Sequence, residues 1–327
     1  MKKVFLRFVL PILVSGMVIG LFFRDISLDD ILTGFLRLSP LILGGFVVLS
    51  LVGTVLRAVR YHILLSGQLP FLDVFLITLV RNFAVDLLPA RSAALLFYSA
   101  LTRKKGIALE EGASSFVVSV FYDGLALSFM LGGLAFLLSA QSGMTAIYWG
   151  VAVLFLISVG VLFLSERILA LCLGFGFLGR FPRLTGALAK VLDYLSRHKN
   201  PGERIRLFLL SFAIRLIKYV FVYLLFEGVV RMGWGIENFA LFCFGLAGAE
   251  LSSLLPIQGL GGFGTWELAF AVVFRALQIP AENIREAGFV IHITTQAWEY
   301  AIGLVAFLIL ALGRGSRKAE APSGDAP

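Results

Sequence analysis

The chain has 327 residues, of which 59% are hydrophobic and only 15% are charged, whereas about 25% of the residues in an ordinary soluble domain are charged. With a mean hydropathy of +0.94, this composition excludes a soluble globular protein and favours an integral membrane protein. The 28 Lys and Arg residues outnumber the 20 Asp and Glu residues, for a net charge of +8. In a membrane protein such an excess is first a topology signal, so we expect no nucleic-acid partner.

Six apolar runs approach or exceed the roughly 20 residues that a helix needs to cross a bilayer. They cover residues 4–23, 41–56, 113–138, 146–164, 207–230 and 287–312. The first run resembles a secretory signal, but no small-residue cleavage site precedes Arg24, so we expect an uncleaved span. The sequence therefore predicts an all-α, polytopic membrane bundle with about six full spans.

Two further apolar stretches, residues 71–101 and 239–277, contain polar and helix-breaking residues, and each predicts a broken helix. The first is interrupted by Arg81, Asn82, Asp86, Pro89 and Arg91. The second is interrupted by Glu250, Pro256, Gly259, Gly261, Gly262, Gly264 and Glu267.

The basic clusters predict how these stretches thread. They lie at residues 2–7, 57–60, 103–105, 167–206 and 314–318, and the positive-inside rule places all of them in the cytoplasm. The first broken stretch then begins and ends inside, and the second begins and ends outside. Legs of about 13 to 15 residues reach only about 20 Å into a core of about 30 Å. We therefore predict two re-entrant hairpins that enter from opposite faces; two pairs of ordinary kinked spans are the alternative.

The domain prediction is a single transmembrane domain over residues 1–312, in the inner (plasma) membrane with both termini cytoplasmic. Residues 167–206 form either interfacial amphipathic helices, at 168–178 and 187–195, or a basic connector. Residues 313–327 are expected to be a disordered cytoplasmic tail. The two cysteines and three histidines have no metal-ligand spacing, so we expect no metal and no other cofactor.

Ionisable groups at membrane depth cost at least about 2.5 kcal/mol on insertion scales, so each is a candidate functional residue. In the first hairpin, Asp86 is expected to pair with Arg81 or Arg91, which leaves one guanidinium for a phosphate group. Asn82 belongs to the same candidate site. Alternatively, the arginines bond the carbonyls that Pro89 frees.

In the second hairpin, Gly261, Gly262 and Gly264 permit a sharp turn before a new helix, whose first N–H groups can bind an anion. No strand precedes the turn, so a nucleotide loop is not expected. Glu267 in the first turn of that helix is either a counter-charge to an arginine or a proton-coupling carboxylate.

Other ionisable residues lie in or beside spans. Asp123 and Glu250 are further candidates for the substrate site, and Arg215 and Lys218 are expected to reach Asp123 or Glu299, or to extend to the interface. Residues 57 and 60 are interpreted as cytoplasmic anchors. His292 and Glu299, seven residues apart, share a helical face and predict a hydrogen-bonded pair or a proton relay.

The chain resembles stand-alone members of the lysylphosphatidylglycerol synthase transmembrane (flippase-like) family, which lack the soluble transferase domain. The resemblance covers about Arg57 to Leu312. Its motifs are Arg57 and Arg60, Asn82 with Leu88-Pro89 and Arg91, Asp123-Gly124, and the block from Pro256 through Gly264 to Glu267. Ala93-Ala94 and Ser119-Val120 stand where many members carry charged pairs.

The resemblance implies a transporter that moves a lipid headgroup through a cavity between the hairpins, and not an enzyme. The expected cargo is an anionic or polar membrane phospholipid, or a polyprenyl (isoprenoid) lipid. A second copy of the chain or an enzyme of envelope synthesis is a further candidate partner. The alternatives are a membrane-embedded lipid-modifying enzyme, with Glu267, Asp123 or His292 as acid or base, and a scaffold for a synthase.

Overall fold

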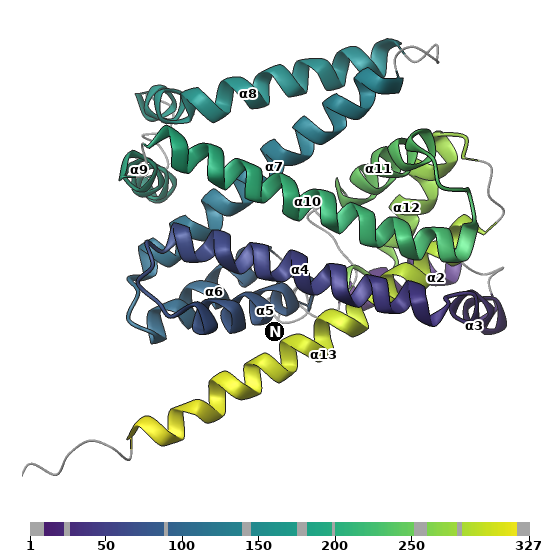
Figure 1. Ribbon diagram of the computed structural model, residues 1–327, viewed down its shortest axis with the longest axis horizontal. Helices are drawn as coiled ribbons and strands as arrows, with labels where there is room; N and C mark the ends of the chain where they lie inside the picture. The colour runs from purple at the N-terminus through teal and green to yellow at the C-terminus, as the bar shows by residue number, and fades with distance from the viewer. Residues whose placement is uncertain are drawn as a thin grey trace, which may run out of the picture.

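The computed structural model describes residues 10–22, 27–87, 91–138, 145–174, 182–197, 200–251, 260–279 and 283–318. Regular structure in these segments is helical (Figure 1). Four helices are long and apolar enough to cross a membrane. They are α4 (Pro40–Leu64), α7 (Leu109–Leu138), α10 (Pro201–Val230) and α13 (Ile284–Lys318).

Local sequence signals set where the long helices begin and end. Ser39 precedes α4 and accepts a hydrogen bond from the Ile42 N–H at 3.3 Å, with Pro40 in the first turn, a position that suits proline because its missing N–H has no helical partner. Asn200 caps α10 in the same way. At the other end α10 stops at Arg231, which adopts a left-handed conformation.

Two of the six expected spans correspond to helices outside that group of four. Residues 4–23 contain α2 (Leu10–Phe22), and residues 146–164 lie in α8 (Thr145–Gly174). Their membrane crossing stays a prediction. The described part of the first expected interfacial piece, residues 168–174, is the end of α8, and its position in the interface stays a prediction. The second expected piece, 187–195, lies in the amphipathic helix α9 (Pro182–Arg197).

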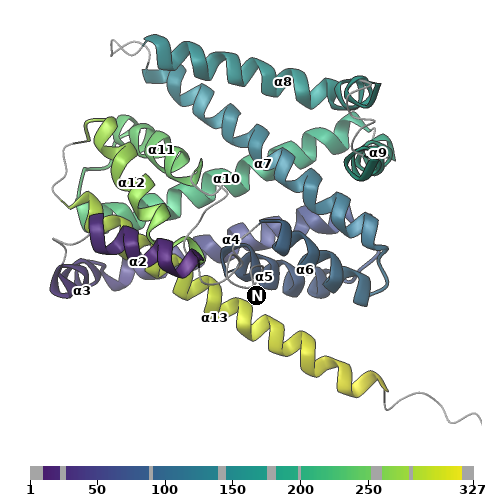
Figure 2. The ribbon, with the colours of Figure 1, turned by 180° about the vertical axis from the view of Figure 1, so that it is seen from behind.

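The two broken stretches form pairs of short helices. The first contains α5 (Phe71–Leu87) and α6 (Arg91–Lys104). The second contains α11 (Ile236–Leu251), a 3₁₀ turn, η4 (Leu260–Gly262), and α12 (Thr265–Ala276). The pairs lie at opposite ends of the long helices, with α5 and α6 near α9, and α11 and α12 near α2 and α3 (Leu28–Leu36) (Figures 1 and 2). Re-entry into a membrane stays a prediction, and the breaks at 88–90 and 252–259 lie outside the described residues.

Two apolar cores stabilise the two ends. One, here called the α12 core, joins α11 and α12 to the long helices through side chains such as Phe226, Phe242 and Phe274. The other, the α5 core, joins α5, α6 and α9 to the same long helices through side chains such as Tyr61, Tyr98 and Val80. Along each long helix some buried polar residues lie between the two cores: Ser50 and Thr54 of α4, Ser128 of α7, Ser211 of α10 and Gln296 of α13.

One close helix crossing connects the two ends. Helix α13 packs along α5, and a Cβ added at Gly303 would lie 2.4 Å from the Cβ of Phe83. Only glycine permits this approach, because any side chain would force the helices apart. Helix α5 also contacts η4, so the first short pair meets the glycine turn of the second.

Candidate functional site

A buried ion pair joins α4, α7 and α10. The Arg60 guanidinium, which is fully buried, donates to both carboxylate oxygens of Asp123, at 2.5 and 3.2 Å. It also donates to the Ser211 hydroxyl at 2.7 Å. The interpretation of Arg60 as a cytoplasmic anchor is therefore wrong: α4 continues to Leu64 and turns this side chain into the bundle.

A second arginine group lies beside this pair. Arg57 of α4 and Arg81 of α5 both donate to the side-chain oxygen of Asn82, at 2.9 and 3.2 Å. Arg81 and Asn82 are buried. Among the described residues, the Nε atoms of all three arginines and the amide nitrogen of Asn82 have no hydrogen-bond partner. We call these six residues the arginine layer: Arg57, Arg60, Arg81, Asn82, Asp123 and Ser211.

The arginine layer carries a net positive charge. Three guanidiniums and the carboxylate of Asp123 give the layer a charge of about +2 by the usual ionisation of these groups. Glu299 of α13, outside the layer, also acts electrostatically on Arg57 and brings the local charge to about +1. Aromatic rings cover part of it: the Arg81 guanidinium lies 5.0 Å from the centroid of the Phe116 ring and 6.0 Å from that of Tyr61.

A third cluster extends the layer along α10. Glu250 of α11 accepts hydrogen bonds from Arg215 at 2.8 Å, from Lys218 at 2.6 Å and from the Tyr219 hydroxyl at 3.2 Å. The two cations were expected to reach Asp123 or Glu299, or to extend to the interface; instead, both form ion pairs with Glu250. Arg215 follows Ser211 by one helical turn, so this cluster adjoins the arginine layer.

A separate polar group fixes the glycine turn. The Glu267 carboxylate lies 2.5 Å from Nδ1 of His292 and accepts a bond from the Gly264 N–H at 2.8 Å. Phe263 stacks on the His292 ring at a centroid distance of 4.5 Å, and Trp266 lies tilted against the same ring at 4.9 Å. The expected pairing of His292 with Glu299 is therefore wrong, because the ring turns toward α12. Among the described residues, Glu267 forms an ion pair with this histidine and with no arginine.

The glycines of this turn adopt conformations that favour glycine. Gly261, Gly262 and Gly264 have φ values of 60, 80 and 85°, which side chains with a Cβ rarely adopt. A Cβ at Gly261 would also lie 3.0 Å from the Tyr300 hydroxyl. The Ser15 hydroxyl of α2 donates to the Phe263 carbonyl at 2.8 Å, so three segments hold the turn.

The comparison with known families decides the classification. The family described as "Lysylphosphatidylglycerol synthase TM region" matches residues 8–303. The chain belongs to this family. As a member of the lysylphosphatidylglycerol synthase TM region family with several long apolar helices, it is a membrane-embedded protein linked to lipid handling. A comparison with curated proteins finds no match.

In this family member, the structure brings together part of the site predicted from sequence. Arg81 and Asn82 lie in one cluster with Asp123 through the arginines of α4, whereas Glu250 lies in the adjoining cluster of α10. Gly261, Gly262, Gly264 and Glu267 form the turn. The side chains of Asp86 and Arg91, and all of Pro89, lie outside the described residues.

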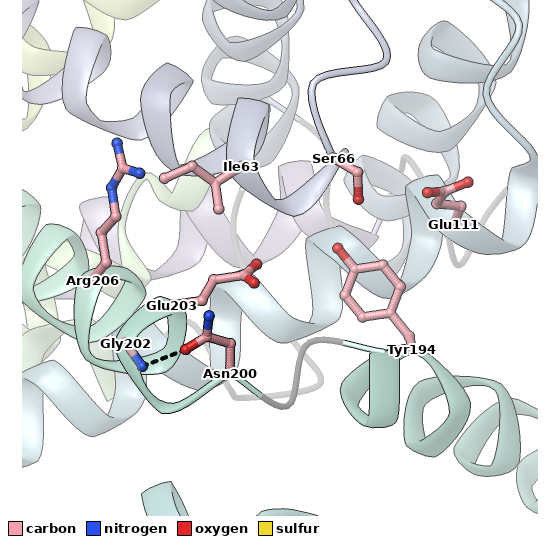
Figure 3. Close-up of a pocket in the computed structure, with 8 residues that line it drawn as sticks. All are labelled: Ile63, Ser66, Glu111, Tyr194, Asn200, Gly202, Glu203 and Arg206. Atoms are coloured by element: carbon pink, nitrogen blue, oxygen red, sulfur yellow. Dashed lines mark hydrogen bonds between the residues drawn. The ribbon is translucent and has the colours of Figure 1, made fainter.

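The described cavity of about 600 Å³ lies elsewhere, where α4 ends and α10 begins (Figure 3). It is lined by Ile63, Ser66, Glu111, Tyr194, Asn200, Gly202, Glu203 and Arg206. Its two carboxylates disfavour an anion, so we do not assign the anion site to this cavity. A cavity between the two short pairs stays a prediction. No group of three or more His, Cys, Asp or Glu residues suited to a metal occurs among the described residues.

Proposed function

We propose that this protein moves the headgroup of an anionic lipid between the two leaflets of the membrane, and that the arginine layer holds the headgroup on the way. One observation carries the proposal: Arg57 and Arg81 both donate to a single amide oxygen, while the Nε atoms of both lack an acceptor among the described residues. Buried guanidiniums normally have a full set of acceptors. An incoming phosphate would supply them.

The chemistry of the layer suits a lipid phosphate. Arginine binds phosphate oxygens through a planar fork that can form two parallel hydrogen bonds. A phosphate diester brings one negative charge, which the arginine layer can offset, since its charge is about +2, or about +1 with the Glu299 carboxylate counted, by the usual ionisation of these groups. Because the surroundings are apolar, each such contact is stronger than it would be in water.

The position of the layer suits translocation. It lies beside the α5 core, whose Tyr61 and Tyr122 adjoin Arg60 and Asp123 along the chain, and its Ser211 lies between that core and the α12 core along α10. A headgroup bound there would be inside the bundle, between its two ends. The short helix pairs, as re-entrant hairpins, would close the path from opposite sides, and the turn at Gly261 to Gly264 would let the outer pair move. Asp123 or Glu267 would offset charge when the headgroup leaves, and the acyl chains would stay in the bilayer.

The proposed cargo is a membrane phospholipid or an isoprenoid lipid phosphate, and the proposed activity is transport without chemical change. The proposed setting is the inner (plasma) membrane with both termini in the cytoplasm, where a second copy of the chain or an envelope-synthesis enzyme is a proposed partner. A chemically altered lipid after incubation with the purified protein would contradict the transport proposal in favour of an enzyme.

Headgroup transfer in vesicles tests the proposal. The purified chain is reconstituted in phosphatidylcholine vesicles with a trace of phosphatidylglycerol that carries a reducible fluorescent label, and the labelled headgroup reaching the outer leaflet is followed. We expect transfer by the wild type and at least a tenfold loss in Arg81→Ala, because one charged hydrogen-bonding partner contributes about 1.5–3 kcal/mol.

The matched control is Arg103→Ala, which removes an exposed arginine at the end of α6 and is expected to transfer as the wild type does. Arg81→Lys serves if the alanine variant does not fold: it keeps the charge and loses the fork, so an intermediate rate is expected. Absence of transfer by the wild type for this lipid and for a polyprenyl phosphate, or equal rates for Arg81→Ala and the wild type, would contradict the proposal.

A further inference from the structure

The Glu267 carboxylate is buried, and its ion-pair partner among the described residues is a histidine. The side chains of Glu267 and His292 are 0% and 6% exposed, and the carboxylate oxygen lies 2.5 Å from Nδ1. Among the described residues, no ion pair links a lysine or arginine to this carboxylate. The charge of the pair therefore depends on whether the imidazole is neutral or protonated.

The second ring nitrogen faces an amide that can serve both states. Nε2 of His292 lies 3.2 Å from the side-chain nitrogen of Gln296. In this orientation the amide donates and Nε2 accepts, so the ring is neutral with its proton on Nδ1, and the pair has a net charge of −1. The oxygen of Gln296, a residue only 9% exposed, has no partner among the described residues.

Rotation of the Gln296 amide exchanges these two atoms. The oxygen would then face Nε2 and accept a hydrogen bond from it, provided that Nε2 carries a proton. The unpartnered oxygen is therefore an acceptor for a second imidazole proton, and a buried polar atom of this kind calls for such an explanation. The site can accommodate the neutral ring and the protonated ring with one side-chain rotation.

We infer that Nε2 of His292 is a proton-binding site, and that proton binding locks the glycine turn, residues 261–264, onto α13. A proton from water forms one N–H bond at Nε2 and no other covalent bond changes. The pair then passes from a charge of −1 to zero. The Nδ1 hydrogen bond to Glu267 becomes charge-assisted at both ends, which strengthens it.

The same residues connect the proton to the turn. Glu267 bonds the Gly264 N–H, and Phe263 and Trp266 lie against the imidazole. When the proton leaves, a net negative charge stays buried and the bond to Glu267 weakens. The turn, whose glycines tolerate many backbone conformations, is then free to separate from α13.

Among the described residues, the following charged groups on the neighbouring helices have other partners or lie farther along their helices. Glu250 is paired with Arg215 and Lys218, Glu286 with Arg37, and Arg81 bonds Asn82. Glu299 lies seven residues beyond His292, about 10 Å along α13, and Arg275 eight residues beyond Glu267, about 12 Å along α12. Glu237 and Arg285 lie at the starts of α11 and α13, and α2 has no charged residue between Leu10 and Phe22.

Nitrogen NMR of histidine tests the proton site directly. The full chain, labelled with ¹⁵N-histidine, is placed in phosphatidylcholine vesicles and followed from pH 8 to pH 5; the loss of signal in His292→Gln assigns the residue among the three histidines. We expect Nδ1 to stay protonated and Nε2 to gain a proton in one transition. Gln296→Leu removes the amide that can bond either state of the ring, and should weaken proton binding because the bond from the charged ring is the stronger of the two.

Hydrogen exchange of the turn tests the lock. Exchange of a peptide covering residues 261–270 is compared between the wild type and His292→Gln at each pH, so that the intrinsic pH dependence cancels. We expect the wild type to exchange relatively faster as pH rises. An Nε2 that does not change between pH 5 and 8, an unchanged midpoint in Gln296→Leu, or a constant exchange ratio would overturn the inference. None of these readouts requires lipid transfer, so they separate this inference from the proposed function.

Discussion

The arginine layer and the Glu267–His292 pair are both buried polar groups beside broken helices. They differ in whether their hydrogen-bonding atoms have partners within the chain. In the arginine layer, cations outnumber carboxylates and several donors have no acceptor among the described residues. In the Glu267–His292 pair, both carboxylate oxygens are bonded within the chain. The first group is suited to receive a partner from outside the chain, whereas the second holds two parts of the chain together.

The difference arises from which helices supply each group. The arginine layer draws on four different helices, α4, α5, α7 and α10, so its shape depends on how the bundle is packed. The Glu267–His292 pair joins only α12 to α13 and lies next to a turn with three positive φ angles. Movement of the turn therefore changes the geometry of this pair first. It reaches the arginine layer only indirectly, through the packing of α5 against η4 and α13.

The largest expected effect on stability comes from Arg60→Ala. It leaves the Asp123 carboxylate buried without its cation, and breaking a buried pair in this way costs about 3–5 kcal/mol. Thermal unfolding of the purified protein measures the loss, with the exposed Arg103→Ala as the control, for which a change below about 0.5 kcal/mol is expected. Equal stability of Arg60→Ala and the wild type would show that this ion pair does not hold the layer.

Glu267→Ala comes next. It leaves the Gly264 N–H and the Nδ1 proton of His292 without their acceptor, and unsatisfied buried groups cost about 1–3 kcal/mol each, so the expected loss overlaps that of Arg60→Ala. The same unfolding measurement, at pH 5 and at pH 8, also detects the proton site. For this purpose Glu267→Gln is compared with the wild type, and the difference in their stabilities is expected to change with pH. When both proteins also carry His292→Gln, the difference should no longer change with pH. A change that persists would contradict the role of the pair.

Asn82→Asp separates binding from stability. The new carboxylate would stand between the guanidiniums of Arg57 and Arg81 and take the place that we assign to the phosphate. We expect at least a tenfold loss of transfer, which corresponds to about 1.4 kcal/mol, with stability equal to or above that of the wild type. Transfer and thermal unfolding of one preparation check both statements, and an unchanged transfer rate would refute the assignment.

Ser211→Ala is expected to have the smallest effect. It removes one acceptor of Arg60, at 2.7 Å, but leaves both bonds to Asp123, so a loss of about 0.5–1.5 kcal/mol is expected. A double-mutant cycle with Asp123→Asn measures the coupling between the two acceptors. A loss as large as that of Arg60→Ala would mean that the hydroxyl, and not the carboxylate, fixes the guanidinium.

Helix positions were largely predictable because apolar runs and breakers are local signals. The runs at 113–138 and 207–230 lie within α7 and α10, and both broken stretches contain two short helices. The run at 41–56 was taken to end before Arg57, but α4 continues to Leu64 because Tyr61, Ile63 and Leu64 resume the apolar pattern. That resumption was the signal that could have placed Arg60 inside the bundle.

Pairings between helices were not predictable from one sequence. His292 and Glu299 share a helical face by spacing, but the partner of His292 is Glu267, on another helix. Likewise, the sequence left several carboxylates as possible partners of Lys218, and the packing of α10 against α11 selects Glu250. Such choices depend on helix rotation, which charge and hydropathy patterns do not determine.

Native mass spectrometry of the purified chain tests the central claim, that the arginine layer binds an anionic lipid headgroup. Wild type, Arg103→Ala and Asn82→Asp are released from vesicles that contain equal amounts of phosphatidylcholine and phosphatidylglycerol. We predict that the wild type and Arg103→Ala retain one phosphatidylglycerol and that Asn82→Asp does not. Equal retention by Asn82→Asp, or retention of phosphatidylcholine alone by the wild type, would contradict the claim.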